Sequence, residues 1–252
     1  MTRHLTIITG SSRGLGAALM AQCLLPGHTV LGIARHTHPA LQARADAAGL
    51  RLVQWPLDLA DASAAAQRLQ DWLTGLDGAA LRTATLINNA GVVGRLAPLD
   101  QVPFAALSQA RRVGLEAAVL LSAAFLHATR DWPGARRVLN ISSGLGRSAM
   151  AGSAAYCAAK AGMDHFSRAV ALEQASQANP ARVVSMAPGV IDTDMQAELR
   201  ASDSALFPER ARFVQMQADG VLVSAQVCAQ RLLARLDRAD FGQAPVADIR
   251  DV

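Results

Sequence analysis

A tyrosine and a lysine stand four residues apart in the stretch "SAAYCAAK", residues 153–160. Tyr156 is the only tyrosine of the chain, and Lys160 is the only lysine among its 24 basic residues. In a helix this spacing places both side chains on one face. An ammonium group beside a phenol favours the ionised form of the phenol, whereas a guanidinium is broader and permanently charged. The pair therefore predicts acid–base chemistry, with a chance pairing on a helix surface as the alternative.

A glycine-rich loop follows the first apolar run of the chain. The stretch "TGSSRGLG" places Gly10, Gly14 and Gly16 between the run "LTIIT" and a helix expected over 15–25. Glycine allows the backbone to turn tightly against a pyrophosphate, and the start of the helix offers free N–H groups to the anion. The loop predicts a dinucleotide site, and a simple tight turn is the alternative.

Two arginines occupy positions that bear on the choice of cofactor. In a common dinucleotide fold, the second strand ends in an acidic residue that binds the adenosine ribose of NAD. Here that strand ends in "GIARHT" with Arg35, and Arg13 lies inside the glycine loop. Two guanidiniums can bind the 2′-phosphate of NADP. We therefore expect NADP (NADPH) as the cofactor, with two merely exposed arginines as the alternative.

Short β-rich runs alternate with alanine-rich helical stretches along the chain. Strands are expected at "LTIIT", "TVLGIA", "LVQWPL", "ATLINN", "RRVLNIS", "RVVSMAP" and near "APVAD". Helices are expected over 15–25, 39–48 and 61–75, in a region to about 130, from about 153 to 178 and within about 194–236. This rhythm predicts an α/β fold, a single Rossmann-type doubly wound parallel sheet with helices on both faces.

The length and composition suit one domain. A chain of 252 residues with 51% hydrophobic content can bury one sizeable core, so we expect a single domain over 1–252. The stretch 193–219 has irregular signals, including Pro208, and is expected to form a mobile helical flap over a site.

Charge and cysteine content exclude several classes of function. The net charge is +4, but the arginines are scattered, so no nucleic-acid partner is expected. Three widely spaced cysteines fit neither a disulfide framework nor zinc ligands, and six histidines show no metal-site spacing. Without a signal peptide or a long apolar run, we expect a cytoplasmic protein that binds neither metal nor membrane.

Five motifs together resemble the short-chain dehydrogenase/reductase family over nearly the whole chain. They are "TGSSRGLG", "NNAG" at 88–91, "ISS" at 141–143, "YCAAK" at 156–160 and "PGVIDT" at 188–193. The resemblance implies that Tyr156 protonates a substrate carbonyl as hydride arrives from the nicotinamide, and that Lys160 lowers the pKa of Tyr156 and holds the ribose. It assigns the hydrogen bond to the carbonyl oxygen to Ser143, with Ser142 as the fallback.

The resemblance also implies a set of cofactor residues. Asp58 lies beside the adenine, Asn89 to Gly91 line the groove, and the segment 188–193 fixes the carboxamide. The complete expected set is Gly10, Ser12, Arg13, Gly14, Leu15, Gly16, Arg35, Asp58, Leu59, Asn89, Ala90, Gly91, Tyr156, Lys160, Pro188, Gly189, Ile191 and Thr193.

One position departs from the family pattern. Many members carry an asparagine that supports a water between the catalytic lysine and solvent, and Gly114 stands at that position here. We expect a water to occupy the space that the missing side chain leaves.

The C-terminal part more closely resembles sepiapterin reductases and related bacterial diketone reductases. The resemblance rests on "AAYCAAKAGMD", "MAPGVIDTDMQ", "GVLVSAQVCAQRLLARL" and "FGQAPVADIRDV". It implies that Asp248 accepts hydrogen bonds from a pterin ring and forms the substrate site with Ser143, Tyr156 and Gly189. A solvated acidic residue near the chain end is the alternative for Asp248.

These observations predict an NADPH-dependent carbonyl reductase of a ketone or vicinal dicarbonyl, with a sepiapterin-like pterin side chain favoured. The alternatives are a reductase of aromatic diketones such as benzil, and a non-catalytic NADP-sensing regulatory protein. The helix over 153–178 has apolar residues on more than one face. Together with the family resemblance, this predicts a homodimer or a dimer of dimers (a homotetramer).

Overall fold

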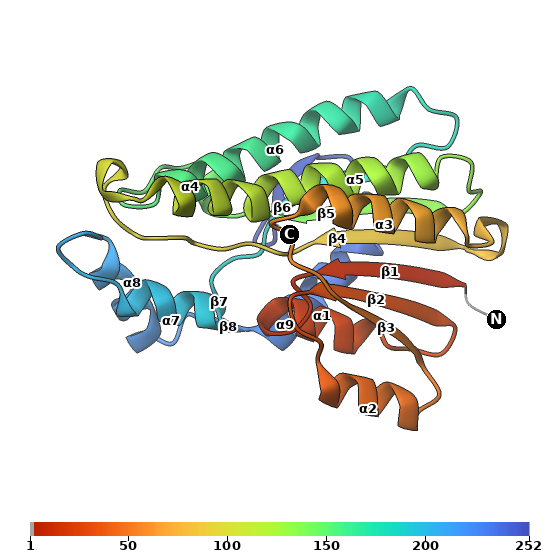
Figure 1. The fold of residues 1–252 in the computed structure, drawn as a ribbon, viewed down its shortest axis with the longest axis horizontal. Helices are drawn as coiled ribbons and strands as arrows, with labels where there is room; N and C mark the ends of the chain where they lie inside the picture. Colours follow the sequence, from red (N-terminus) through yellow and green to blue (C-terminus); the bar gives the residue numbers. More distant parts are fainter. Residues whose placement is uncertain (1–2, 252) are drawn as a thin grey trace.

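A seven-stranded sheet forms the centre of the molecule (Figure 1). The structure is a computed structural model, and it describes residues 3–251. The strands lie in the order β3-β2-β1-β4-β5-β6-β9, and all neighbouring strands run parallel. Their bounds are β1 His4–Thr9, β2 His28–Ala34, β3 Arg51–Pro56, β4 Thr83–Asn88, β5 Ala135–Ile141, β6 Arg182–Ala187 and β9 Val246–Asp248. The predicted doubly wound parallel sheet is confirmed.

Helices cover both faces of this sheet (Figure 1). One face carries α1 Gly14–Cys23, α2 Pro39–Ala47 and α9 Ala225–Leu236, and the other carries α3 Ala62–Thr74, α4 Phe104–Arg111, α5 Ala117–Ala128 and α6 Ala154–Ala175. Each face has its own apolar core. Alternate strand residues such as Ile8 and Ile7 face opposite cores because side chains alternate along a strand. A strand that is buried on both faces has a nearly continuous run of apolar residues in its sequence. This explains the run "LTIIT" in β1.

The sheet order determines where a ligand can bind. From β1, the chain first continues towards β2 and β3 and then returns to β4 on the other side of β1. The loops that follow β1 and β4 therefore diverge at the carboxyl ends of these neighbouring strands. Such a switch point leaves a crevice, and ligands of open α/β sheets bind there.

The region between β4 and β5 is interrupted within its helical part. The single helical region expected to about residue 130 consists of the short turn η2 Leu99–Gln101, then α4, the π-helical turn η3 Arg112–Glu116 and α5. Gly114 is buried in the middle of η3. Single π-turns of this kind often mark functional sites. Two other short turns are η1 Gly78–Ala80 and η4 Gly144–Gly146.

The segment 193–219 is helical and packs on the body of the molecule. It contains α7 Asp194–Ala201 and α8 Arg210–Ala218, and the short parallel strands β7 Ile191–Asp192 and β8 Val223–Ser224 flank it. Leu199 and the fully buried Phe207 form a small apolar cluster with Val93 and Leu96 from the loop after β4. The predicted helices are present, and their mobility stays a prediction.

The described residues show neither a membrane-crossing helix nor a metal centre. Within 3–251, no helix combines the length and apolar character that a bilayer span requires. The same residues contain no cluster of histidine, cysteine, aspartate or glutamate suited to hold a metal ion. Cys23, Cys157 and Cys228 are all free thiols.

Candidate active site

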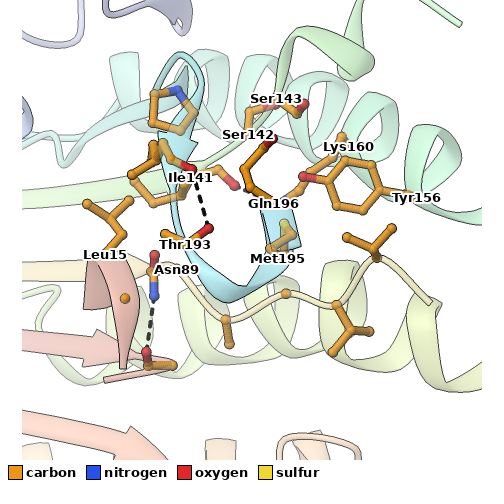
Figure 2. A pocket seen from close by; sticks show the side chains of 18 of the residues that line it. Leu15, Asn89, Ile141, Ser142, Ser143, Tyr156, Lys160, Thr193, Met195 and Gln196 are labelled. Atoms are coloured by element: carbon orange, nitrogen blue, oxygen red, sulfur yellow. Dashed lines mark hydrogen bonds between the residues drawn. The ribbon is translucent and has the colours of Figure 1, made fainter. Parts of the chain in front are cut away.

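A cavity of about 600 Å³ lies at the carboxyl ends of the strands, under α7 and α8. Its volume is in the range of ligand sites in proteins. The cavity is lined by every residue of the expected cofactor and substrate sets except Gly16. Figure 2 shows Ser143, Tyr156 and Lys160 around one part of it, with Asn89 and Leu15 in another. Folding thus brings together residues from nearly the whole chain.

The glycine loop forms one end of the cavity. Gly10 and Gly14 have positive φ angles of 66° and 54°, which favour glycine. Gly16 is buried, and a Cβ atom there would lie 2.1 Å from the carbonyl oxygen of Gly10. Gly16 therefore allows α1 to pack closely on the loop and does not line the cavity, in contrast to the expectation of a binding residue.

A hydrogen-bond network joins this loop to the segment "NNAG". The backbone N–H groups of Asn89 and Ala90 donate to Oγ1 of Thr9, each at 2.9 Å. The Asn89 side chain donates to the carbonyl oxygens of Thr9 and Gly10, at 3.0 and 3.3 Å. These bonds fix the walls of the groove at the switch point. Sequence reasoning missed Thr9, although its place at the end of the first strand was a usable signal.

Arg35 and Arg13 line the cavity beside the glycine loop, but their surroundings differ. Arg35 follows β2, is exposed, and makes no side-chain hydrogen bond or ion pair within residues 3–251. Arg13 donates to Asp194 of α7 at 2.8 Å, and both side chains are about two-thirds exposed. An exposed ion pair is weak, about 0–1 kcal/mol, so an incoming phosphate can replace Asp194. Both guanidiniums are available to an anion.

Tyr156 and Lys160 lie on one face of α6, as the spacing predicts. The Lys160 Nζ atom lies 5.6 Å from the centre of the Tyr156 ring and donates to the carbonyl oxygen of Ile141 at 2.7 Å. Burial lowers the pKa of Lys160 to about 8, and the carboxylate of Asp164 acts in the opposite direction. Burial raises the pKa of Tyr156, whereas its hydrogen bond with Ser143 acts to lower it. At neutral pH this arrangement presents a phenol and an ammonium side by side.

The structure distinguishes the two adjacent serines. Ser142 is buried, and its hydroxyl donates to Asp164 at 2.6 Å. Ser143 lies at the cavity and begins the turn η4, where its Oγ atom accepts a hydrogen bond from the N–H of Leu145 at 3.2 Å. Oγ acts as the acceptor in that bond, and the hydroxyl hydrogen bonds with Tyr156, where a carbonyl oxygen of a ligand can compete for it. The geometry therefore favours Ser143 over the fallback Ser142.

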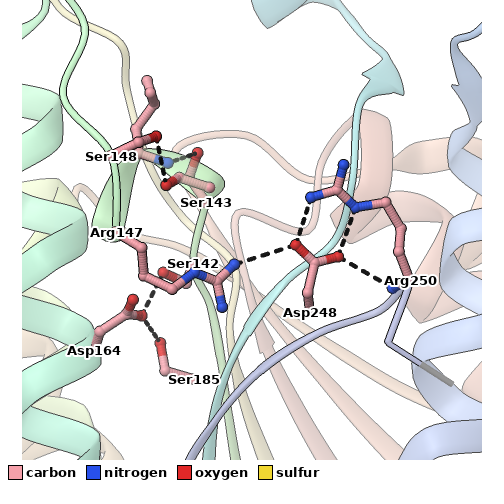
Figure 3. Close-up of polar contacts among 10 residues, drawn as sticks. Ser142, Ser143, Arg147, Ser148, Asp164, Ser185, Asp248 and Arg250 are labelled. Carbon is pink, nitrogen blue, oxygen red and sulfur yellow. Dashed lines mark hydrogen bonds and ion pairs between the residues drawn. The ribbon is translucent and has the colours of Figure 1, made fainter.

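Asp248 is buried at the cavity, but its carboxylate is fully engaged (Figure 3). Oδ1 accepts from the backbone N–H and Nε of Arg250, at 3.0 and 2.8 Å. Oδ2 accepts from Nη2 of Arg250 at 2.6 Å and Nη2 of Arg147 at 3.1 Å. The hydrogen bonds from Arg250 lower the pKa of Asp248 despite its burial.

Four hydrogen bonds use the four acceptor positions of a carboxylate. That Asp248 binds a pterin ring stays a prediction, and a pterin would have to displace an arginine to reach this carboxylate. The alternative of a solvated, frayed terminus does not hold either, since Asp248 is 6% exposed and pairs with β6.

Gly114 lies in η3 with its Cα facing α6. A Cβ atom at this position would lie 3.4 Å from Cβ of Ala159, and no other heavy atom outside its own helix lies within 4 Å. The space beside Gly114 is therefore suited to a larger group. That a water occupies it stays a prediction.

Sequence reasoning did not single out the residues that α7 and α8 contribute. Met195, Gln196, Leu199, Phe213 and Met216 line the cavity opposite Tyr156. Oε1 of Gln196 is buried and has no hydrogen-bond partner among the described residues. No local pattern identifies these side chains, because only the packing of the two helices aims them at the cavity.

Comparisons with known proteins agree with this geometry. The sequence model of the family described as short chain dehydrogenase matches residues 4–204. A benzil reductase ((S)-benzoin forming) of Bacillus subtilis is 35% identical over 93% of this chain and 94% of its own. A sepiapterin reductase of Meriones unguiculatus is 32% identical over 97% of this chain and 95% of its own.

Solved structures give the same result. A metagenomic short-chain oxidoreductase in complex with NADP is 25% identical, with a TM-score of 0.73. The match covers 98% of this chain and 95% of that one.

Proposed function

The chain belongs to the short-chain dehydrogenase family, and on this premise we propose that it is an NADPH-dependent carbonyl reductase of ketones or vicinal dicarbonyls. The observation that carries the proposal is the meeting of Ser143, Tyr156 and Lys160 in the cavity that the glycine loop enters. Members of this family are oxidoreductases that act on carbonyl or alcohol groups. What we propose for this chain is the identity of the cofactor and of the substrate.

The cavity has features that suit a dinucleotide. Gly10 and Gly14 line the cavity at the start of α1, where free backbone N–H groups can bind a pyrophosphate. Arg35 and Arg13 would hold a 2′-phosphate, and Asp58 and Leu59 would lie beside the adenine. The rest of the cofactor would be held by Asn89 to Gly91 and by Pro188, Gly189, Ile191 and Thr193. When bound, the cofactor supplies the hydride.

The remaining chemistry is assigned to this chain's own residues. Ser143 would donate a hydrogen bond to the substrate carbonyl oxygen, and Tyr156 would donate the proton that this oxygen needs as hydride is added. The phenolate that results has an ammonium, Lys160, next to it, and the Ile141 carbonyl holds that ammonium in place. Lys160 thus stabilises the charge that develops on Tyr156.

Among the candidate substrates, the site favours a vicinal diketone with apolar substituents. The substrate part of the cavity presents apolar side chains, among them Val93, Met150, Met195 and Phe213. Asp248, the group that would bind the polar edge of a pterin, is occupied by two arginines. The pterin substrate stays the second candidate, supported by the identity to sepiapterin reductases. A cofactor sensor without catalysis is disfavoured, because sensing does not require a phenol beside an ammonium.

A turnover assay tests this proposal. The purified protein is mixed with NADPH or NADH and with benzil, sepiapterin or a simple ketone, and loss of the nicotinamide absorbance is followed. We expect turnover of benzil with NADPH, and turnover about 10²- to 10⁴-fold slower in the Tyr156→Phe variant. Absence of turnover with every ketone would contradict the proposal, and preference for sepiapterin would reverse the order of the two substrates.

A further inference from the structure

A buried carboxylate outside the proposed catalytic set, that of Asp164, lies beside Ser142 and Ser185 (Figure 3). Asp164 is one helical turn beyond Lys160 on α6 and is 2% exposed. Its Oδ1 atom accepts hydrogen bonds from the hydroxyls of Ser142 at 2.6 Å and Ser185 at 2.7 Å. Its Oδ2 atom has no hydrogen-bond partner among the described residues. Burial of a carboxylate costs free energy, so a hydrophobic residue would be the default at this position.

Asp164 contacts both ends of the turn that carries Ser143. At the first end, Ser142 precedes Ser143 directly and donates to Oδ1. At the other end, a Cβ atom on Gly146 would lie 2.6 Å from Oδ2 of Asp164 and 3.0 Å from the backbone oxygen of Lys160. The turn η4 therefore lies directly on the carboxylate, and only glycine allows this approach. Through these contacts, Asp164 sets the position of Ser143.

Asp164 also acts on Lys160. The two residues stand at i and i+4 on one helix face, where opposite charges attract. Around the ammonium, β5 presents the carbonyl oxygen of Ile141, and the loop after β4 presents Gly91; neither titrates. Tyr156 faces it from α6 itself. The Asp164 carboxylate opposes the effect of burial and keeps the pKa of Lys160 from falling further than about 8.

We propose that Asp164 is a positioning residue of the reductase, which holds the Ser143 turn in place and keeps the Lys160 ammonium beside Tyr156. This inference rests on the proposed function. It assigns two separable effects to one side chain: a hydrogen bond that acts on the turn, and a charge that acts on the lysine. Each effect has a variant that removes it alone.

Three substitutions separate these effects. Asp164→Asn keeps the size and an acceptor oxygen for Ser142 but removes the charge. Ser142→Ala removes the bond to the turn and keeps the charge. Ser185→Ala is the matched control, because it removes a hydrogen bond of the same kind to the same oxygen but lies on β6, outside the turn. Circular dichroism and NADPH binding, by its fluorescence, verify that each variant is folded.

Kinetics against pH provide the first readout. In Asp164→Asn, we expect kcat/KM to begin falling at a pH about one unit lower than in the unmodified protein. This is the low end of the pKa shift that a neighbouring charge produces. In Ser142→Ala, we expect kcat to drop about 10- to 100-fold at every pH because the serine turn shifts, with the pH limb unmoved. Ser185→Ala should match the unmodified protein in both. Equal losses in Ser142→Ala and Ser185→Ala would overturn the proposal in favour of a purely structural role.

A second readout does not depend on activity. Because Lys160 is the only lysine, protein made with isotope-labelled lysine gives a single lysine side-chain signal by NMR, and its titration reports the pKa directly. We expect a lower pKa in Asp164→Asn and an unchanged one in the two serine variants. An unchanged pKa in Asp164→Asn would overturn the effect on the lysine. If the unmodified protein reduces no ketone, the proposed function fails, while this titration still tests the effect of Asp164 on Lys160.

Discussion

At the scale of single residues, the central feature is one phenol and one ammonium held together by a single helix. Lys160 is buried, and its ammonium donates a hydrogen bond to the Ile141 carbonyl, which holds it in a defined position. A guanidinium is too broad for this place and cannot titrate. Every other basic position of the chain is an arginine, which favours the prediction that the site uses an ammonium here.

The catalytic assignment predicts the effect of two substitutions. Tyr156→Phe should lower kcat about 10²- to 10⁴-fold, the usual contribution of a general acid, while NADPH binding changes little. Lys160→Arg should also lose activity because the broader group cannot occupy the buried position. Steady-state kinetics and fluorescence titration with NADPH measure these effects. If Lys160→Arg retains most of the activity, the assignment of the lysine is wrong.

The low pKa of Lys160 predicts the pH dependence of the reaction. Burial places this pKa at about 8, below the ordinary lysine value of 10.5, so the ammonium is present below pH 8 and is lost above it. Loss of this charge removes the stabilisation of the phenolate that forms on Tyr156. We therefore expect kcat/KM for reduction to fall as the pH rises through about 8. A profile that stays flat well above this pH contradicts the assignment.

The exposed arginine after β2 predicts the cofactor preference. Arg35→Ala should weaken transition-state binding with NADPH by about 1.5–3 kcal/mol, the value of one charge-assisted hydrogen bond, and leave NADH little affected. The ratio of kcat/KM for the two cofactors measures this. Arg44→Ala, on the distant surface of α2, is the matched control. Equal kcat/KM for NADPH and NADH in the unmodified protein would refute the cofactor proposal.

At the scale of elements, the π-helical turn η3 carries Gly114 at the position where the family resemblance leads us to expect an asparagine. An interior glycine usually costs a helix about 0.5–1 kcal/mol relative to alanine, yet Gly114 lies in the middle of this turn. Its Cα faces α6, and an added Cβ would touch only Ala159, the residue that precedes Lys160. The turn thus leaves room beside α6 for a small side chain at position 114.

This space predicts the outcome of restoring the family residue. Gly114→Asn should leave kcat similar or modestly higher, because the added Cβ meets Ala159 at an ordinary distance of 3.4 Å and the amide can take over from a water. Kinetics at several pH values, compared with Gly114→Ala, test this. A loss of activity in both variants would show that catalysis requires this space to stay free of a side chain. An apolar side chain found in that space would contradict the prediction that a water occupies it.

At the scale of the whole molecule, one side carries large apolar residues without cover in the single chain. Phe104 of α4 and Leu172 of α6 are 90% and 77% exposed. These two helices lie on the same outer face of the sheet (Figure 1). Exposed apolar side chains can form part of a protein interface, and that this face is one stays a prediction.

This face carries the prediction of a homodimer or homotetramer. Leu172→Glu should weaken association, because it places like charges opposite each other across a two-fold axis. Light scattering at micromolar concentration measures the mass, and a variant on the opposite side of the sheet, such as Leu25→Glu, serves as the control. A monomeric mass for the unmodified protein would contradict the prediction.

The sequence by itself determined the fold class, the seven strands and most of the site. Local patterns suffice for these, because the glycine loop, the Tyr156–Lys160 spacing and the strand runs each express their physical constraint within a few neighbouring residues. Only the tertiary structure decided which side chains are already occupied. Asp248 is engaged by Arg147, 101 residues away, and Asp164 joins β5, β6 and the serine turn. Such contacts have no local signature, because they depend on how distant elements pack.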